Sequence, residues 1–213
     1  MKQHMYWEDR YAIIPYTRFL IEDPSFFSLL ESYEVYDNRV SFQTFADLHM
    51  KKWISFGEQA KTVDEITVFE CAYLQNHINE LLLFHCMAEK DINDYLMKLI
   101  TTVKDLNPIL IYLSQPDVYE TINRVSDSRV DEKGEKVWRD RVISYIENSA
   151  YGKAHSLEGF DGMVTYFKDR KKIELNIINN LPVETYIINN AEYNWDEVWE
   201  EIQKIIIRII KGE

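Results

Sequence analysis

The 213-residue chain has only two cysteines, no segment rich in glycine, proline or serine, and no long apolar run. Cys71 and Cys86 lie in apolar or helical surroundings, which indicates reduced packing thiols and favours a reducing cytosol. The opening residues, MKQHMYWEDR, lack the apolar centre of a signal peptide, and no run reaches membrane-spanning length. We therefore expect a cytoplasmic protein with no membrane partner.

Basic residues are also scarce, with 24 Lys and Arg against 36 Asp and Glu and a formal net charge of −12. This balance disfavours a nucleic-acid or anionic-membrane binder, because both need a concentrated positive field. A small anionic ligand held by a few local arginines is compatible with it. The length, the absence of a linker and the absence of an internal repeat indicate a single α/β domain over residues 1–213.

The segment from Thr67 to Phe84 organises the rest of the sequence. Residues 65–69 alternate and carry β-branched side chains, which predicts a strand, and the apolar residues of 78–84 predict a following helix. Glu70, Gln75 and Asn76 stand between the two. In open parallel sheets ligands bind outside the carboxyl ends of the strands, so these three residues are candidate ligand contacts. The alternative for Glu70 is a cap or the partner of a nearby arginine.

Before this segment, the spacing predicts an edge strand or extended arm at 11–16, a helix at 24–32 and a helix capped by Ser41 and running to about residue 56. After it, apolar periodicity and breakers predict helices from 91 capped by Asp91, from 118, through 142–146, over 160–178 and from 195 capped by Asn194. Trp195 and Trp199 belong to the expected core face of the last helix.

Three short apolar runs, at 66–69, 109–113 and 183–188, are expected to form parallel strands of one sheet, because helical patterns separate them. The 109–113 run, ILIYL, is nearly continuous, which is typical of a strand covered on both faces. Helix is expected to outweigh strand. The predicted fold class is therefore α/β, with a parallel sheet flanked by helices.

Four phrases, in order, suggest a family: VFECAYLQNHINELLLFH, NPILIYLSQPDVYETINRV, RDRVISYIENSAYGKAH and YNWDEVWEEI. Together they resemble the later two-thirds of bacterial P-loop proteins of the thymidylate-kinase-like nucleoside and nucleotide kinase superfamily. The resemblance covers nearly all of the chain, from about Tyr11 onward. It implies an incomplete P-loop kinase-like fold, a nucleoside or nucleotide as small-molecule partner, and ATP with Mg²⁺ as cofactors.

The resemblance also implies roles for individual residues. Glu70 would take the catalytic position, where a carboxylate orients the acceptor hydroxyl or the metal, and Gln75 and Asn76 would face the acceptor. Tyr16 and Arg39 would line the acceptor pocket. Residues 124–155 would form a lid whose arginines meet the donor phosphates: Arg124, Arg129, Arg139 and Arg141. Acidic residues are interleaved with these arginines, so a solvated helix with internal ion pairs is the alternative.

One departure from the family is the absence of the phosphate-binding loop, G-x-x-x-x-G-K-[ST]. Gly152-Lys153 is followed by Ala154, and Glu147 stands where the first glycine of the loop would be. The sequence therefore predicts a chain that begins after this loop, lacks the central strand of the sheet and is inactive alone. Apolar surface left uncovered would favour a homo-oligomer. The alternative is a non-catalytic relative that binds a ligand or partner.

His77 and His85, with Glu80 between them, are a candidate metal pair. Their separation of eight residues differs from the usual spacing of three or four, so surface or capping roles are favoured and no metal site is predicted.

Overall fold

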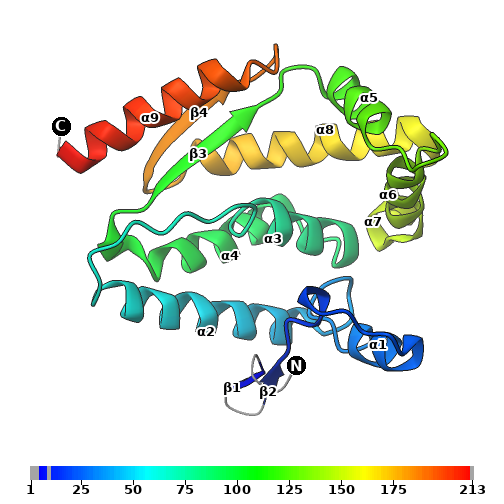
Figure 1. Cartoon of the computed structure of the whole chain (residues 1–213), viewed down its shortest axis with the longest axis horizontal. Coiled ribbons are helices and arrows are strands. Elements are labelled where there is room, and N and C mark those ends of the chain that lie inside the picture. Colours follow the sequence, from blue (N-terminus) through cyan, green and yellow to red (C-terminus); the bar gives the residue numbers. More distant parts are fainter. Residues whose placement is uncertain (1–4, 9–10, 212–213) are drawn as a thin grey trace. The chain divides into compact units, whose positions relative to one another are not determined.

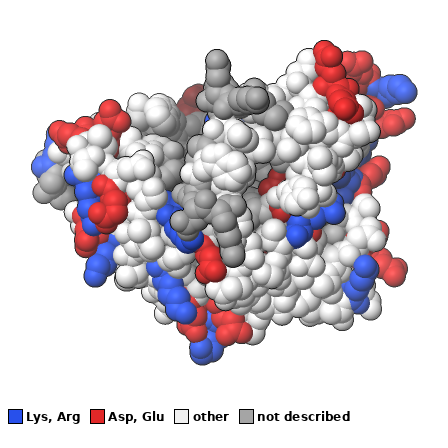
Figure 2. Space-filling model, turned by 90° about the horizontal axis from the view of Figure 1, so that it is seen from below, with Lys and Arg blue, Asp and Glu red and all other residues white. Residues whose placement is uncertain are grey.

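The computed structural model describes residues 5–8 and 11–211. It forms two compact units, Met1–Phe45 and Ala46–Glu213, which are described separately (Figure 1). No helix within the described residues is long and apolar enough to cross a membrane. On the face shown in Figure 2, acidic and basic side chains lie beside one another.

The first unit begins with a two-stranded antiparallel ribbon, in which β1 (Tyr6–Glu8) pairs with β2 (Tyr11–Ile13). A 3-10 turn, η2 (Tyr16–Arg18), follows, and then helix α1 (Pro24–Glu31). The Asp23 carboxylate accepts the Ser25 and Phe26 amides at 2.9 and 3.3 Å, which fixes the start of α1. The predicted strand and helix are both present.

Helix α2 (Phe42–Ala60) starts at the end of this unit. The Ser41 hydroxyl accepts the Thr44 amide at 3.2 Å, so the predicted cap is confirmed. The helix extends four residues beyond the predicted end at residue 56.

The core of the second unit is built from helices. Helix α3 (Gln75–Asn79) continues directly into a π-helical turn, η3 (Glu80–Phe84), and α4 (Glu89–Thr101) follows. The fully buried side chains of these elements include Ile78, Leu81, Leu83, Leu96 and Leu99. Ala88 occupies the N-cap of α4, so the predicted cap at Asp91 is wrong by three residues, and Asp91 lies in the first turn, where its charge favours the helix dipole.

The sheet of the second unit has two parallel strands, β3 (Ile109–Ser114) and β4 (Glu184–Asn189), in register from Ile109↔Glu184 to Ser114↔Asn189. The chain between them crosses over through four helices: α5 (Val118–Ser128), α6 (Val137–Asn148), α7 (Ala150–Ala154) and α8 (Gly159–Ile178). A parallel pair requires such a crossover. These two strands confirm the coarse α/β prediction, while the P-loop kinase fold stays a prediction.

Helix α9 (Trp195–Lys211) packs on one face of this sheet. Val198 and Ile205 form a buried cluster with Ile188 of β4, and Ile109 and Ile111 of β3 pack against it. Asn194 accepts the Glu197 amide at 3.4 Å, as a cap would. Trp195 and Trp199, which were predicted to face the core, are instead 57% and 55% exposed, because β3 and β4 cover only one stripe of the helix.

The third predicted strand is absent. Residues 64–69 have no regular secondary structure, and Ile66 and Val68 are 67% and 82% exposed. The prediction was wrong because a strand needs a neighbour for its backbone groups, and the described residues supply none at this place. For the same reason β3 is only half-buried rather than covered on both faces.

Candidate functional site

The segment before α3 brings two of the predicted contacts together. The Cys71 thiol lies 2.5 Å from Glu70 Oε1 and 3.3 Å from Gln75 Oε1, and it donates to these oxygens. Burial, followed by the hydrogen bond to Glu70, raises the pKa of Cys71 to about 11, so the thiol keeps its proton at neutral pH. Cys71 has a φ of 59°, a left-handed conformation that turns the chain sharply between Glu70 and the helix. Glu70 and Gln75 are exposed on either side of it.

Packing on both sides of this turn holds it in place. The Phe69 ring lies 4.8 Å from the Phe56 ring of α2, and the Tyr73 hydroxyl donates to the Leu96 carbonyl of α4 at 3.0 Å. The Asn76 amide donates to the Cys71 carbonyl at 3.3 Å, so this predicted contact residue serves the turn through its backbone. The exposed Glu70 carboxylate is therefore carried on an anchored segment.

A polar network on α8 lies beside this turn. Tyr166, Arg170 and Glu174 follow each other at intervals of four residues and so share one face of the helix. The Tyr166 hydroxyl and Arg170 Nη1 both donate to Asn79 Oδ1, at 2.5 and 3.1 Å. Arg170 Nε lies 2.9 Å from Glu174 Oε1, and the Tyr112 hydroxyl of β3 donates to Glu174 Oε2 at 2.7 Å. This network joins α3, α8 and β3.

The charges of this network act on the turn. Beside the larger effects of burial and of Glu70, Arg170 lowers and Glu174 raises the pKa of Cys71, so both charges act on the turn. Burial and, as the next largest cause, the negative charge of Glu174 raise the pKa of Tyr112 well above its ordinary value. The Tyr112 hydroxyl therefore keeps its proton and remains a hydrogen-bond donor. We call the combined set the Glu70 cluster, made of Glu70, Cys71, Gln75, Asn79, Arg170 and Glu174.

Sequence reasoning missed Arg170 and Glu174. The available signal was the repeat of polar residues at 166, 170 and 174, in a helix that also carries Lys168, Asp169, Lys171 and Lys172. In a helix of this kind such a repeat is normally assigned to the solvent-facing side. Here Glu174 is 4% exposed and Tyr166 is 1% exposed, so the stripe faces inward.

The predicted residues of the first unit lie in its turns. Tyr16 belongs to η2, its ring is 5.5 Å from that of Phe27, and burial together with a hydrogen bond to Glu34 raises its pKa to about 12. Arg39 is exposed, and its amide donates to the Tyr36 carbonyl at 3.3 Å. Their predicted place in an acceptor pocket stays a prediction.

The predicted lid arginines make varied contacts. Arg124 of α5 stacks 4.0 Å from the centre of the Tyr193 ring, and Arg129 lies 5.0 Å from that of Trp138. Arg139 pairs with Asp140 at 3.0 Å, while Arg141 is exposed on α6. Ion pairing within the segment accords with the alternative interpretation, and the phosphate-binding role stays a prediction.

The two histidines considered as a metal pair serve separate contacts. His77 Nδ1 is 3.1 Å from the Tyr95 hydroxyl, and His85 Nε2 is 3.3 Å from Glu80 Oε1. His77 is 1% exposed, which corrects the surface or capping role expected for it, because it lies with Ile78 on the buried side of α3. No group of three or more His, Cys, Asp or Glu residues in the described part of the chain is arranged to hold a metal ion.

Comparisons with protein families, with curated proteins and with solved structures found no match to this chain.

Proposed function

We propose that the chain binds a nucleoside or nucleotide at the Glu70 cluster, as the acceptor-binding portion of a kinase-like P-loop protein. The observation that supports this proposal is the convergence of the exposed Glu70 carboxylate and the Gln75 amide on the Cys71 thiol. The charges of the Arg170–Glu174 pair, whose side chains are 15% and 5% exposed, act on the same thiol.

The chemistry of these side chains suits such a ligand. A carboxylate accepts strong hydrogen bonds from ligand hydroxyl or amino groups, and an amide offers both a donor and an acceptor to the edge of a base. Asn79 and Glu174 fix Arg170 through contacts of 3.1 and 2.9 Å, so its charge stays near the turn. Because Cys71 stays protonated, it adds no negative charge beside Glu70.

ATP and Mg²⁺ fit the residues present poorly. The sequence has no glycine-rich loop with the lysine that holds the donor phosphates. In phosphoryl-transfer sites Mg²⁺ is held by one or two carboxylates together with substrate phosphates, and here Glu174 is already paired, which leaves Glu70 alone. The proposal is therefore binding without phosphate transfer by this chain alone. A non-catalytic role for the same cluster, toward another ligand or a partner, is the second reading of the resemblance.

A panel of nucleosides and nucleotides, followed by thermal shift and by ADP release with ATP and Mg²⁺, tests this proposal. We expect at least one ligand to raise the melting temperature, with no steady ADP release. Glu70→Gln should weaken binding by about 10- to 100-fold, because a hydrogen bond to a charged group contributes about 1.5–3 kcal/mol. Glu65→Gln removes an exposed carboxylate five residues earlier and should leave the affinity unchanged.

Two outcomes would contradict the proposal. A folded chain whose melting temperature responds to no member of the panel would exclude acceptor binding. Steady ADP release that disappears in Glu70→Gln would show that the chain transfers phosphate by itself.

A further inference from the structure

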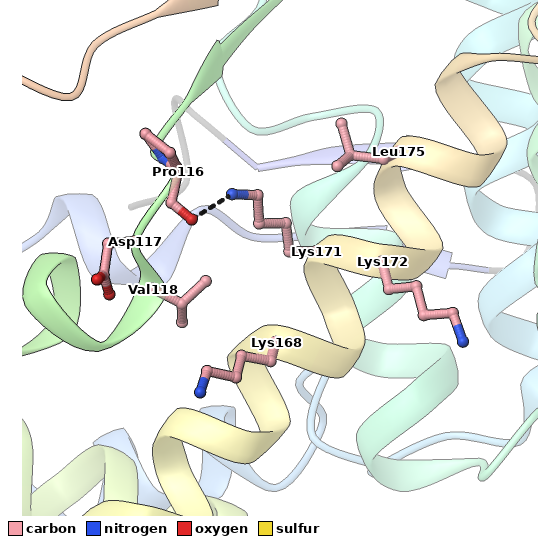
Figure 3. Close-up of a pocket in the computed structure, with 7 residues that line it drawn as sticks. All are labelled: Pro116, Asp117, Val118, Lys168, Lys171, Lys172 and Leu175. Carbon is pink, nitrogen blue, oxygen red and sulfur yellow. Dashed lines mark hydrogen bonds between the residues drawn. The ribbon is translucent and has the colours of Figure 1, made fainter.

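Helix α8 has a second polar face, away from the Glu70 cluster. Lys168, Lys171, Lys172 and Leu175 follow the spacing i, i+3, i+4, i+7 and therefore lie on one side of the helix. Together with Pro116, Asp117 and Val118 they line a hollow of about 680 Å³ (Figure 3). The hollow lies just beyond the carboxyl end of β3, where ligands bind in open parallel sheets.

The lysines of this hollow form no ion pair with an acid among the described residues. Lys168 and Lys172 have no ion-pair partner among the described residues. Lys171 Nζ donates to the backbone carbonyl oxygens of Gln115 and Pro116, which orient the ammonium group without cancelling its charge.

The two acids of α8 that are nearest to these lysines in sequence have other partners. Asp169 accepts a hydrogen bond from the Tyr151 hydroxyl at 3.0 Å, and Glu174 is bound by Arg170 and Tyr112. Three lysines are thus gathered at one hollow in a chain whose net charge is −12.

One carboxylate, that of Asp117, does line the hollow. Its Oδ1 accepts the Glu120 amide at 3.0 Å and caps α5, so its charge faces the positive end of that helix. Figure 3 shows Lys171 extending toward Pro116, with Lys168 on the side of Val118. An anion can therefore approach Lys168 and Lys171 while the Asp117 charge is offset by the helix that it caps.

We propose that this hollow binds a small phosphate-bearing molecule. The lysine ammonium groups are compact charges that bind phosphate oxygens, and Val118 and Leu175 provide apolar wall for the organic part. The site is distinct from the Glu70 cluster and does not depend on the function proposed there. Inorganic phosphate and an organic phosphate offer the same phosphate oxygens to the lysines, and an experiment with both ligands distinguishes them.

The test is a titration of the ¹⁵N-labelled chain with inorganic phosphate, with ribose 5-phosphate and with ribose, followed by amide chemical shifts. Saturable shifts at Val118 and Lys171 are expected with both phosphates, more strongly with the sugar phosphate, and none with ribose. The double variant Lys168→Gln, Lys172→Gln should weaken phosphate binding by roughly tenfold or more. It keeps Lys171, whose carbonyl contacts join α8 to the end of β3.

Two matched variants serve as controls. Lys204→Gln removes an exposed lysine from α9, and Glu70→Gln alters the other site, so both should retain the wild-type affinity for phosphate. Equal weakening by Lys204→Gln would show nonspecific charge attraction and overturn the proposal. Unchanged affinity in the double variant, or no saturable binding of either phosphate, would also overturn it.

Discussion

Replacing Arg170 by methionine is expected to reduce the free energy of unfolding by about 3–5 kcal/mol. The change keeps a long apolar side chain but leaves the Glu174 carboxylate, which is 4% exposed, without the cation 2.9 Å away. The Tyr112 hydroxyl would still donate to Glu174, yet one neutral donor does not replace a charge. Asn79 would lose a donor as well. Urea denaturation followed by circular dichroism measures the effect.

Lys90→Met is the matched control, because Lys90 and Asp94 form an ion pair with the same i, i+4 spacing on α4. Their side chains are 81% and 47% exposed, so solvent screens this pair and Lys90→Met should destabilise the chain far less than Arg170→Met. The double variant Arg170→Met, Glu174→Leu should recover much of the loss, since it removes the unpaired charge. If Arg170→Met cost no more than Lys90→Met, the buried network would not have the energetic role assigned to it.

The helices and the two paired strands could be predicted because their signals are local. Residues 160–178 carry a helical period along their own sequence, and Asp23 and Ser41 cap helices through amides two or three residues away. The 109–113 and 183–188 runs were placed in one parallel sheet because helical segments separate them, and the register of β3 with β4 agrees.

Local signals were not sufficient to predict whether residues 66–69 form a strand. Alternation describes which side chains could face a core, but it carries no information on whether another strand lies alongside. With Val68 82% exposed, this segment has neither the neighbour nor the cover that the pattern presupposes. The prediction was wrong because strand pairing depends on residues that are distant in sequence.

In the candidate site, too, the residues near one another in sequence could be predicted and the distant ones could not. Glu70 and Gln75 are five residues apart, and the turn at Cys71 brings them together. Arg170 comes from a helix about 100 residues later, and sequence reasoning favoured the arginines of 124–141 because the family resemblance pointed to them. The contact of Arg170 with Asn79 depends on how α8 packs against α3, which a helical period does not specify.

Lowering the pH from 7 to 5 is expected to reduce the free energy of unfolding by about 2 kcal/mol through His77 alone. Burial, followed by the neighbouring His49 ring, lowers the pKa of His77 to about 3. In the unfolded chain a histidine has a pKa near 6.5, so below that pH the unfolded state binds a proton that the folded state does not. Stability from this group is therefore complete above about pH 7 and is lost as the pH falls toward 3.

The contacts of His77 explain why the folded state excludes this proton. Its Nδ1 lies 3.1 Å from the Tyr95 hydroxyl, which can donate to it only while that nitrogen carries no proton, and the centre of the His49 ring is 4.6 Å from that of His77. His77→Gln removes the titrating group, so its stability should fall less steeply between pH 7 and 5 than that of the wild type. His155→Gln replaces an exposed histidine stacked on Tyr151 and should keep the wild-type slope. Urea denaturation at both pH values gives the slopes, and equal slopes for the wild type and His77→Gln would exclude the buried neutral histidine as the cause.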